Sequence, residues 1–207
     1  MNDLLSTIND LQHSTIQTKI QQRIHEFKTI DTNSAEDLFK ELCFCILTAN
    51  FNSERTIRIH GKLHTCFCTE TKESLAKKLR QYGYRFPNTR AAYIVESAAK
   101  KDILPTITHT LPHEERRRWL NDNIKGLGYK EASHFLRNIG FDDYAIIDFH
   151  ILDILEQYHL IKKPKTLTTK KYQEIEQVLQ TIATQTNLTL AKLDLYLWYL
   201  ETGKILK

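Results

Sequence analysis

A Gly-x-Gly turn between two helical patterns constrains the fold of this chain more than any other feature. A polar, basic helix end runs through Asn123 into Gly126-Leu127-Gly128, and a second helical pattern follows directly. Glycine can adopt positive φ and lets another backbone or a ligand approach closely. The turn amides and the start of the next helix therefore predict a pocket that suits a phosphate group.

The rest of the sequence is also helical in pattern, and no segment shows the sustained alternation that is typical of strands. The sequence therefore predicts an all-α protein with short polar loops. The expected caps and helix ends are Ser34 before a helix through Leu47, Asn88 or Thr89 before the next helix, Gly140 after the second helix of the hairpin, and later helices at 151–158, 169–183 and 188–201.

Composition limits the class of protein. The 207 residues fit one domain or two lobes, and 41% hydrophobic residues suffice for a packed core. The net charge of +4 permits contact with an anionic polymer without requiring it. No charge-free run reaches the roughly 20 residues needed to span a bilayer, and the N-terminus lacks the features of a signal peptide. We expect a cytoplasmic or nucleoid-associated protein with no membrane segment.

The four cysteines form two C-x-C pairs, Cys43 with Cys45 and Cys66 with Cys68. Metal sites more commonly use C-x₂-C spacing, and residues two apart on a helix point to different faces. Buried, reduced thiols are therefore the favoured interpretation, with a metal site as the alternative. An iron–sulfur cluster is not expected.

Lys130 and Asp148 form a candidate catalytic pair. Lys130 lies in the first turn of the second hairpin helix. Asp148 follows the apolar residues 145–147, which predict that its carboxylate is partly buried. Because burying a carboxylate is costly, its presence there indicates a structural or functional role. An amine and a carboxylate suit cleavage of an N-glycosidic bond, because the carboxylate stabilises a sugar cation and a neutral amine forms a Schiff base. Burial and neighbouring cations such as Lys125 would favour the neutral amine. The alternatives are a phosphate contact for Lys130 and a helix N-cap for Asp148.

Gly126-Leu127-Gly128-Tyr129-Lys130 and Asp148-Phe149-His150 resemble the motifs of the helix-hairpin-helix, Gly/Pro-Asp superfamily of DNA glycosylases. The chain is most similar to the type-2 8-oxoguanine DNA glycosylase/AP lyases, and the absence of cluster cysteines separates it from the endonuclease III branch. Three segments support this branch: Gly83–Phe86 with Ala91–Ile94, Asn123–Gly140, and Leu193–Tyr199 with Thr202–Lys207.

The resemblance implies two helical lobes, with the active site in the cleft between them. One lobe would comprise residues 34–140, and the other residues 1–33 together with 141–207. Lys130 would be the nucleophile, and Asp148 would stabilise the developing sugar cation. The implied reaction is excision of 8-oxoguanine from double-stranded DNA, followed by β-elimination that nicks the strand. The resemblance also implies a monomer without a required cofactor, and a monovalent cation held by hairpin carbonyls near Ile124 and Leu127.

The resemblance also suggests residues that read the extruded base. Trp198 would stack on the base, with ordinary core packing as its alternative. Phe86 is either a core residue, which we favour, or the opposite wall of the pocket. The carboxylate of Lys207 would accept a hydrogen bond from N7–H of 8-oxoguanine, where guanine presents an acceptor instead.

Other residues are candidates for contact with the DNA strand. Asn50 would either fill the space that the extruded nucleotide leaves, or end its helix in the left-handed conformation. Gly126 and Gly128 would bind the backbone through their amides. Lys125 and Arg137, with Arg85 or Arg90, are phosphate-contact candidates or parts of a solvated helix face. Two other functions remain: a glycosylase/lyase for other oxidised bases, and a noncatalytic hairpin module that binds DNA.

Overall fold

The computed structural model describes all 207 residues, which form twelve α-helices and one 3-10 helix without any strand. The predicted all-α class is confirmed. The chain divides into two compact units. Unit 1 contains Met1–Thr29 and Leu136–Leu206, and unit 2 contains Ile30–Phe135 together with Lys207. The division falls inside the second hairpin helix, whereas we expected it after Gly140. The last residue also groups with unit 2 and not with the C-terminal helices.

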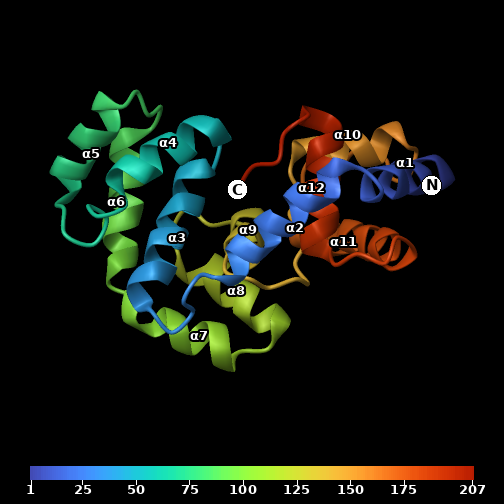
Figure 1. The fold of residues 1–207 in the computed structure, drawn as a ribbon. Coiled ribbons are helices and arrows are strands. Elements are labelled where there is room, and N and C mark those ends of the chain that lie inside the picture. The colour runs from blue at the N-terminus through green and yellow to red at the C-terminus, as the bar shows by residue number, and fades with distance from the viewer. The chain divides into compact units, whose positions relative to one another are not determined.

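Unit 2 is built around one buried helix, α3, which Figure 1 shows in the middle of this unit. Helix α3 packs against α4, α6 and α7, and α5 pairs with α6. The helices of this unit are α3 (Ala35–Thr48), α4 (Ser53–Leu63), α5 (Lys72–Gln81), α6 (Pro87–Ala98), η1 (Lys101–Ile103), α7 (Leu104–Thr110), α8 (His113–Asn123) and most of α9 (Tyr129–Asn138).

Helix α3 begins with the predicted cap at Ser34. The Ser34 hydroxyl accepts a hydrogen bond from the Asp37 amide at 3.2 Å, and acidic residues occupy the first turn. Every residue from Glu41 to Thr48 is buried. Neighbouring helices therefore surround the second half of α3, which explains how side chains only two positions apart can both be buried.

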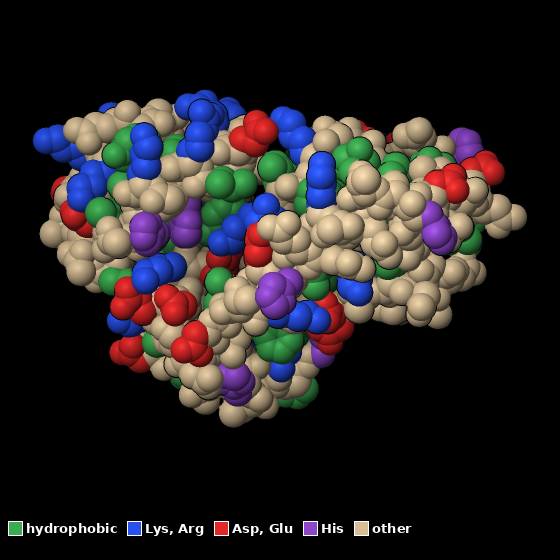
Figure 2. Space-filling model, viewed as in Figure 1, with side chains coloured by type: hydrophobic (Ala, Val, Ile, Leu, Met, Phe, Trp, Pro, Cys, Tyr) green, Lys and Arg blue, Asp and Glu red, His purple; other side chains and the backbone are tan.

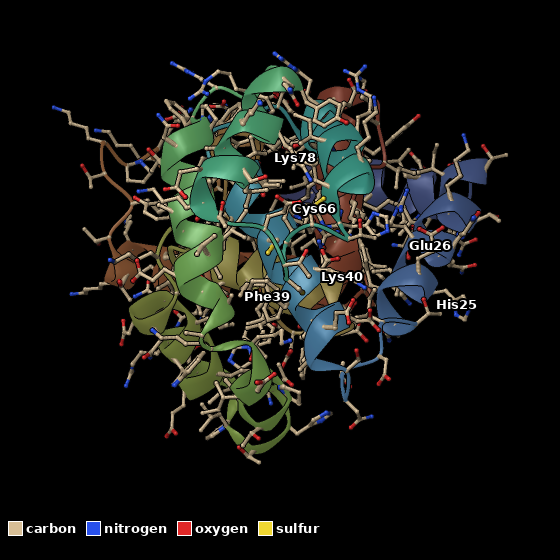
Figure 3. All side chains as sticks on the ribbon, turned by 90° about the vertical axis from the view of Figure 1, so that its left-hand side faces the viewer. His25, Glu26, Phe39, Lys40, Cys66 and Lys78 are labelled. Atoms are coloured by element: carbon tan, nitrogen blue, oxygen red, sulfur yellow. The ribbon has the colours of Figure 1, made fainter.

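The cysteines are free thiols, as predicted. Cys43 and Cys45 are buried in α3, and burial raises the pKa of the Cys43 thiol well above its usual value. Cys66 and Cys68 are only partly buried, so the prediction of burial holds for one pair. Nζ of Lys78 lies 3.3 Å from Sγ of Cys66 (Figure 3). No group of three or more His, Cys, Asp or Glu side chains could hold a metal ion.

Unit 1 contains α1 (Asn2–Gln12), α2 (Thr15–Lys28), α10 (Phe149–Gln157), α11 (Thr169–Gln185) and α12 (Leu190–Thr202). Helix α12 contacts each of the other four helices. The apolar stripe of α2 recurs every three or four residues and packs against one face of α12. The buried members of this cluster are Ile16, Ile20, Ile24, Phe27, Ala191, Leu195 and Tyr196. The late helices were expected, and where their observed bounds differ from the predicted ones they differ by one or two residues.

The predicted cap at Asn88 or Thr89 is wrong. Helix α6 begins at Pro87, which occupies the first turn, and its N-cap residue is Phe86, without a side-chain cap. Proline is favoured at this position because the first helical N–H groups lack intrahelical acceptors. Oδ1 of Asn88 instead accepts a hydrogen bond from Arg80 at 2.9 Å, so its polar group serves the contact with α5.

Basic side chains gather on one surface of unit 2, over α4 and α5 (Figure 2). The exposed members are Arg55, Arg58, Lys62, Lys72, Lys77 and Arg80. None of the helices has both the length and the apolar character that a membrane span requires.

Candidate active site

The hairpin turn connects α8 to α9 as the sequence predicted. The amide of Leu127 donates to the carbonyl of Ile124 at 3.2 Å. Gly126 adopts φ +88°, and a β-carbon there would lie 2.6 Å from Cδ2 of Tyr93. Gly128 does not adopt positive φ, so the left-handed conformation applies to only one of the two glycines. A β-carbon on Gly128 would meet Glu131 at 3.4 Å, an ordinary contact.

Lys130 lies in the first turn of α9, and its side chain is 24% exposed. Its Nζ lies 3.5 Å from Oε1 of Glu131, whose side chain is 17% exposed. The candidate nucleophile therefore has a partly buried carboxylate beside it in unit 2. Sequence analysis did not select Glu131, although its place directly after the lysine was a signal. Lys125, the neighbouring cation that we expected to act on Lys130, is 63% exposed and pairs with Glu96 at 2.9 Å.

Asp148 is the N-cap residue of α10 in unit 1. Its Oδ1 accepts a hydrogen bond from the amide of Ile151 at 3.1 Å, which confirms the N-cap alternative. The second oxygen and the partial exposure of the side chain leave this carboxylate able to act on a ligand as well. Because Lys130 belongs to unit 2 and Asp148 to unit 1, their convergence on one nucleotide stays a prediction.

Two side chains of α11 hold the segment that leads to Asp148. The amide of Ala145 donates to Glu176 at 3.1 Å, and the amide of Ile147 donates to the hydroxyl of Tyr172 at 3.2 Å. The same hydroxyl donates to the carbonyl of Ala145 at 2.7 Å. These contacts satisfy a buried backbone that has no strand partner. Sequence analysis did not find Tyr172 and Glu176, because about 25 residues separate them from the segment they hold.

An aromatic cluster adjoins Asp148 in unit 1. The ring of His150 lies 4.6 Å from that of Trp198 in an edge-on arrangement, and 3.9 Å from that of Phe149. Phe149 is 61% exposed, which is unusual for so large an apolar side chain. Trp198 is only partly buried, and its indole Nε1 makes no hydrogen bond. Trp198 is therefore not an ordinary core residue, and its stacking role stays a prediction.

Asn50 lies just beyond the end of α3 with φ +57°, so the left-handed alternative is confirmed. Its side chain is exposed, which leaves the predicted role in the DNA stack open as well. Two buried donors fix the backbone before it. The hydroxyl of Tyr84 donates to the carbonyl of Leu47 at 2.6 Å, and Nη2 of Arg90 donates to the carbonyl of Ala49 at 2.7 Å. Burial raises the pKa of Tyr84.

The basic candidates differ in accessibility. Arg137 has a side chain only 4% exposed; it stacks on the ring of Phe27 and lies 3.8 Å from Asp194. The alternative of a solvated helix face is therefore wrong for Arg137, and its phosphate contact stays a prediction. Arg90 is also buried and holds the loop of Asn50 instead.

One basic and one aromatic candidate, Arg85 and Phe86, lie just before the start of α6. Arg85 is exposed and packs over the ring of Phe86, which is partly buried. Phe86 is therefore not a fully buried core residue, and its place in a base pocket stays a prediction.

Lys207 contacts a buried acid of α3. Its Nζ forms an ion pair with Oε2 of Glu41, whose side chain is 3% exposed, and lies 4.8 Å from the centre of the Phe44 ring. The same ring meets His60 edge-on at 5.4 Å and His134 at 5.8 Å. Glu41 was not a predicted site residue, because the sequence shows only an acidic residue within an apolar helix and gives no indication of its partner.

Comparison with known proteins identifies the family. A family model described as 8-oxoguanine DNA glycosylase matches residues 20–188. The chain belongs to this family. A relative from Methanocaldococcus jannaschii, named 8-oxoguanine DNA glycosylase/AP lyase, is 49% identical over 99% of both chains. A relative of the same name from Korarchaeum cryptofilum is 47% identical over 100% of this chain and 99% of its own.

Solved structures of the family have the same fold. The M. jannaschii 8-oxoguanine glycosylase/lyase, in complex with a 15mer DNA containing 8-oxoguanine, matches with a TM-score of 0.95 and 49% identity over 99% of both chains. The 8-oxoguanine DNA glycosylase of Thermotoga maritima matches with a TM-score of 0.93 and 39% identity over 100% of this chain and 99% of its own. The helix-hairpin-helix glycosylase fold expected from the hairpin is thereby confirmed.

Proposed function

We propose that this protein excises 8-oxoguanine from DNA and nicks the strand at the resulting abasic site. Relatives at 49% and 47% identity over nearly the whole chain carry the name 8-oxoguanine DNA glycosylase/AP lyase. The observation that carries the proposal is the presence of both candidate groups, with Lys130 in the first turn of α9 after the Gly126 turn and Asp148 at the N-cap of α10. A noncatalytic hairpin module would need Asp148 only as a helix cap and Lys130 at most as a phosphate contact.

The reaction follows from the chemistry of these two groups. The neutral amine of Lys130 attacks C1′, the N–C1′ bond forms, and the bond to the damaged base breaks with a proton passing to the base. The Asp148 carboxylate stabilises the positive charge that develops on the sugar. Ring opening gives an imine between Lys130 and the sugar. Loss of a proton from C2′ then expels the 3′ phosphate, and hydrolysis of the imine restores the lysine.

Recognition of the lesion requires the nucleotide to leave the duplex. Trp198 and Phe86 provide aromatic faces for the extruded base, and the carboxylate of Lys207 provides an acceptor for N7–H. Asn50, exposed on a fixed loop, takes the vacated place in the stack. The turn amides at Gly126 and Gly128 bind the strand through phosphate, which carries no sequence information.

No cofactor is part of this proposal. A monovalent cation between the hairpin and a phosphate would use carbonyl oxygens near Ile124 and Leu127. The carbonyl of Ile124 accepts one hydrogen bond, from Leu127, and keeps a second lone pair for such an ion. We propose a monomer that acts on double-stranded DNA.

Borohydride trapping tests the proposal. We expect the wild-type protein to form a covalent adduct with duplexes that contain 8-oxoguanine or an abasic site, and not with undamaged guanine. Lys130→Gln should abolish both adduct formation and nicking, whereas Lys170→Gln, which removes the same charge from an exposed lysine of α11, should keep both. Full trapping by Lys130→Gln would refute the assignment of the nucleophile. Preferred trapping on thymine glycol would identify a glycosylase/lyase for other oxidised bases.

A further inference from the structure

We propose that Glu41 is a positioning residue for Lys207, and that it thereby sets the discrimination between 8-oxoguanine and guanine. This inference rests on the proposed function, in which Lys207 contributes to reading the lesion. The observation behind it is the ion pair between Nζ of Lys207 and Oε2 of Glu41.

The burial of Glu41 makes its charge unusual. Glutamate is almost never fully buried unless it is paired, because removing a carboxylate from water is costly. Glu41 is 2% exposed and begins the continuous buried stretch of α3, between Phe39 and Phe44 in sequence. Packing alone does not require a carboxylate at this position. The structure therefore gives this carboxylate a task that packing does not require.

The surroundings of Lys207 define a specific place for its side chain. Nζ pairs with the carboxylate and also lies over the face of Phe44, at 4.8 Å from the ring centre. A cation near an aromatic face gains electrostatic stabilisation, more so when it is desolvated. The side chain is only 25% exposed. Two separate interactions therefore hold the ammonium.

Helix α3 provides a rigid base for this contact. It is capped by Ser34 and buried on all sides from Glu41 onward. Residues on rigid elements position a functional group more precisely than residues on loops do. A carboxylate that recognises a base through one N–H group must be placed within a few tenths of an ångström to be effective. Glu41 can supply that precision to Lys207 without touching the DNA.

The test compares Glu41→Gln, Lys207→Met, the double variant and the control Glu36→Gln. Glu36 lies on the same helix but is exposed and pairs with Lys40 at 2.8 Å. Excision of 8-oxoguanine, excision of guanine and nicking of a preformed abasic site are measured for each protein. We expect either single change to lower the ratio of 8-oxoguanine excision to guanine excision by about tenfold, since hydrogen bonds to charged groups carry this much free energy. Abasic-site nicking should change less than twofold, and Glu36→Gln should match the wild type.

The double variant separates a shared role from two independent ones. If Glu41 acts through Lys207, the double variant should be no worse than the poorer single variant. Additive losses, or equal losses of excision and nicking, would overturn the inference. Thermal melts identify a variant that has simply lost its fold, and Lys207→Met then still provides the comparison.

A second measurement needs no DNA. A carboxypeptidase specific for C-terminal lysine should release Lys207 slowly from the wild-type chain and at least tenfold faster from Glu41→Gln. Equal release rates would overturn the anchoring role. A wild-type protein that protects Lys207 but does not excise 8-oxoguanine would show that the proposed function has failed and that Glu41 does not act in discrimination.

Discussion

Gly126 and Tyr93 pack so closely that no side chain fits between them. A β-carbon on Gly126 would lie 2.6 Å from Cδ2 of Tyr93, and the glycine also has φ +88°. The hairpin turn and α6 are therefore in direct contact within unit 2. Any other residue at position 126 would clash with Tyr93 and would also have to adopt an unfavourable positive φ.

Gly126→Ala should therefore destabilise the protein by about 2 kcal/mol or more, from left-handed strain and overpacking together. It should also weaken binding to undamaged DNA, because the turn amides move. Urea denaturation and a fluorescence binding titration measure the two effects. Gly61→Ala is the control, since Gly61 lies within α4 with no atom near its added β-carbon. That change should stabilise the protein by about 0.5–1 kcal/mol. A neutral Gly126→Ala would contradict the tight packing.

Asp148 has a capping role that two substitutions can separate from its proposed catalytic role. Asparagine caps helices about as well as aspartate, so Asp148→Asn should leave the melting temperature nearly unchanged while abolishing excision. Asp148→Ala should lose both the activity and about 1 kcal/mol of stability. Activity and thermal unfolding of both variants provide the measurement. Near-normal excision by Asp148→Asn would show that the cap is the only role of this side chain.

The predicted role of the Asn50 side chain in the DNA stack can be tested without changing the backbone conformation at this position. Asn50→Gly keeps the left-handed residue at φ +57° and removes the amide, so stability should stay within a few tenths of a kcal/mol. Excision from duplex DNA should fall, because the vacated stack is no longer filled. Nicking of an abasic site in single-stranded DNA, which has no stack to fill, should be unaffected and serves as the control. An equal loss on both substrates would refute the predicted place in the stack.

His60 makes the stability of unit 2 depend on pH. Burial lowers the pKa of His60 from its usual 6.5, and its Nε2 lies 2.9 Å from the carbonyl of Lys40, so the neutral ring donates there. The unfolded chain therefore binds more protons than the folded chain just below pH 6.5, and stability falls as pH drops through this window. The loss cannot exceed about 1.4 kcal/mol per pH unit for one proton.

Urea denaturation between pH 7.5 and 5 provides the measurement for His60. His60→Gln keeps an N–H donor for the carbonyl of Lys40 but does not titrate. The variant should lose less unfolding free energy than the wild type as the pH falls. Parallel pH profiles for the two proteins would mean that another group causes the dependence.

Local patterns in the sequence were sufficient for much of this protein. Helical periodicity, the cap at Ser34 and the Gly-x-Gly turn depend on neighbours within a few residues, and the structure shows each of them. The N-cap role of Asp148 is equally local. The sequence also led to the family, because the residues around Lys130 and Asp148 form short motifs within the sequence.

Tertiary structure decided what depends on distant residues. Arg137 looked like an accessible cation, but the packing of α9 buries it against Phe27 and Asp194. Glu41 looked like an ordinary helix residue until Lys207, 166 positions later (207 − 41), supplied its counter-charge. Burial and ion pairing depend on which distant segments pack together. A residue and its near neighbours in sequence do not determine which segments those are. Chain-local rules therefore specified the helices and their caps, and long-range packing specified which charged side chains are buried against other parts of the chain and which are exposed.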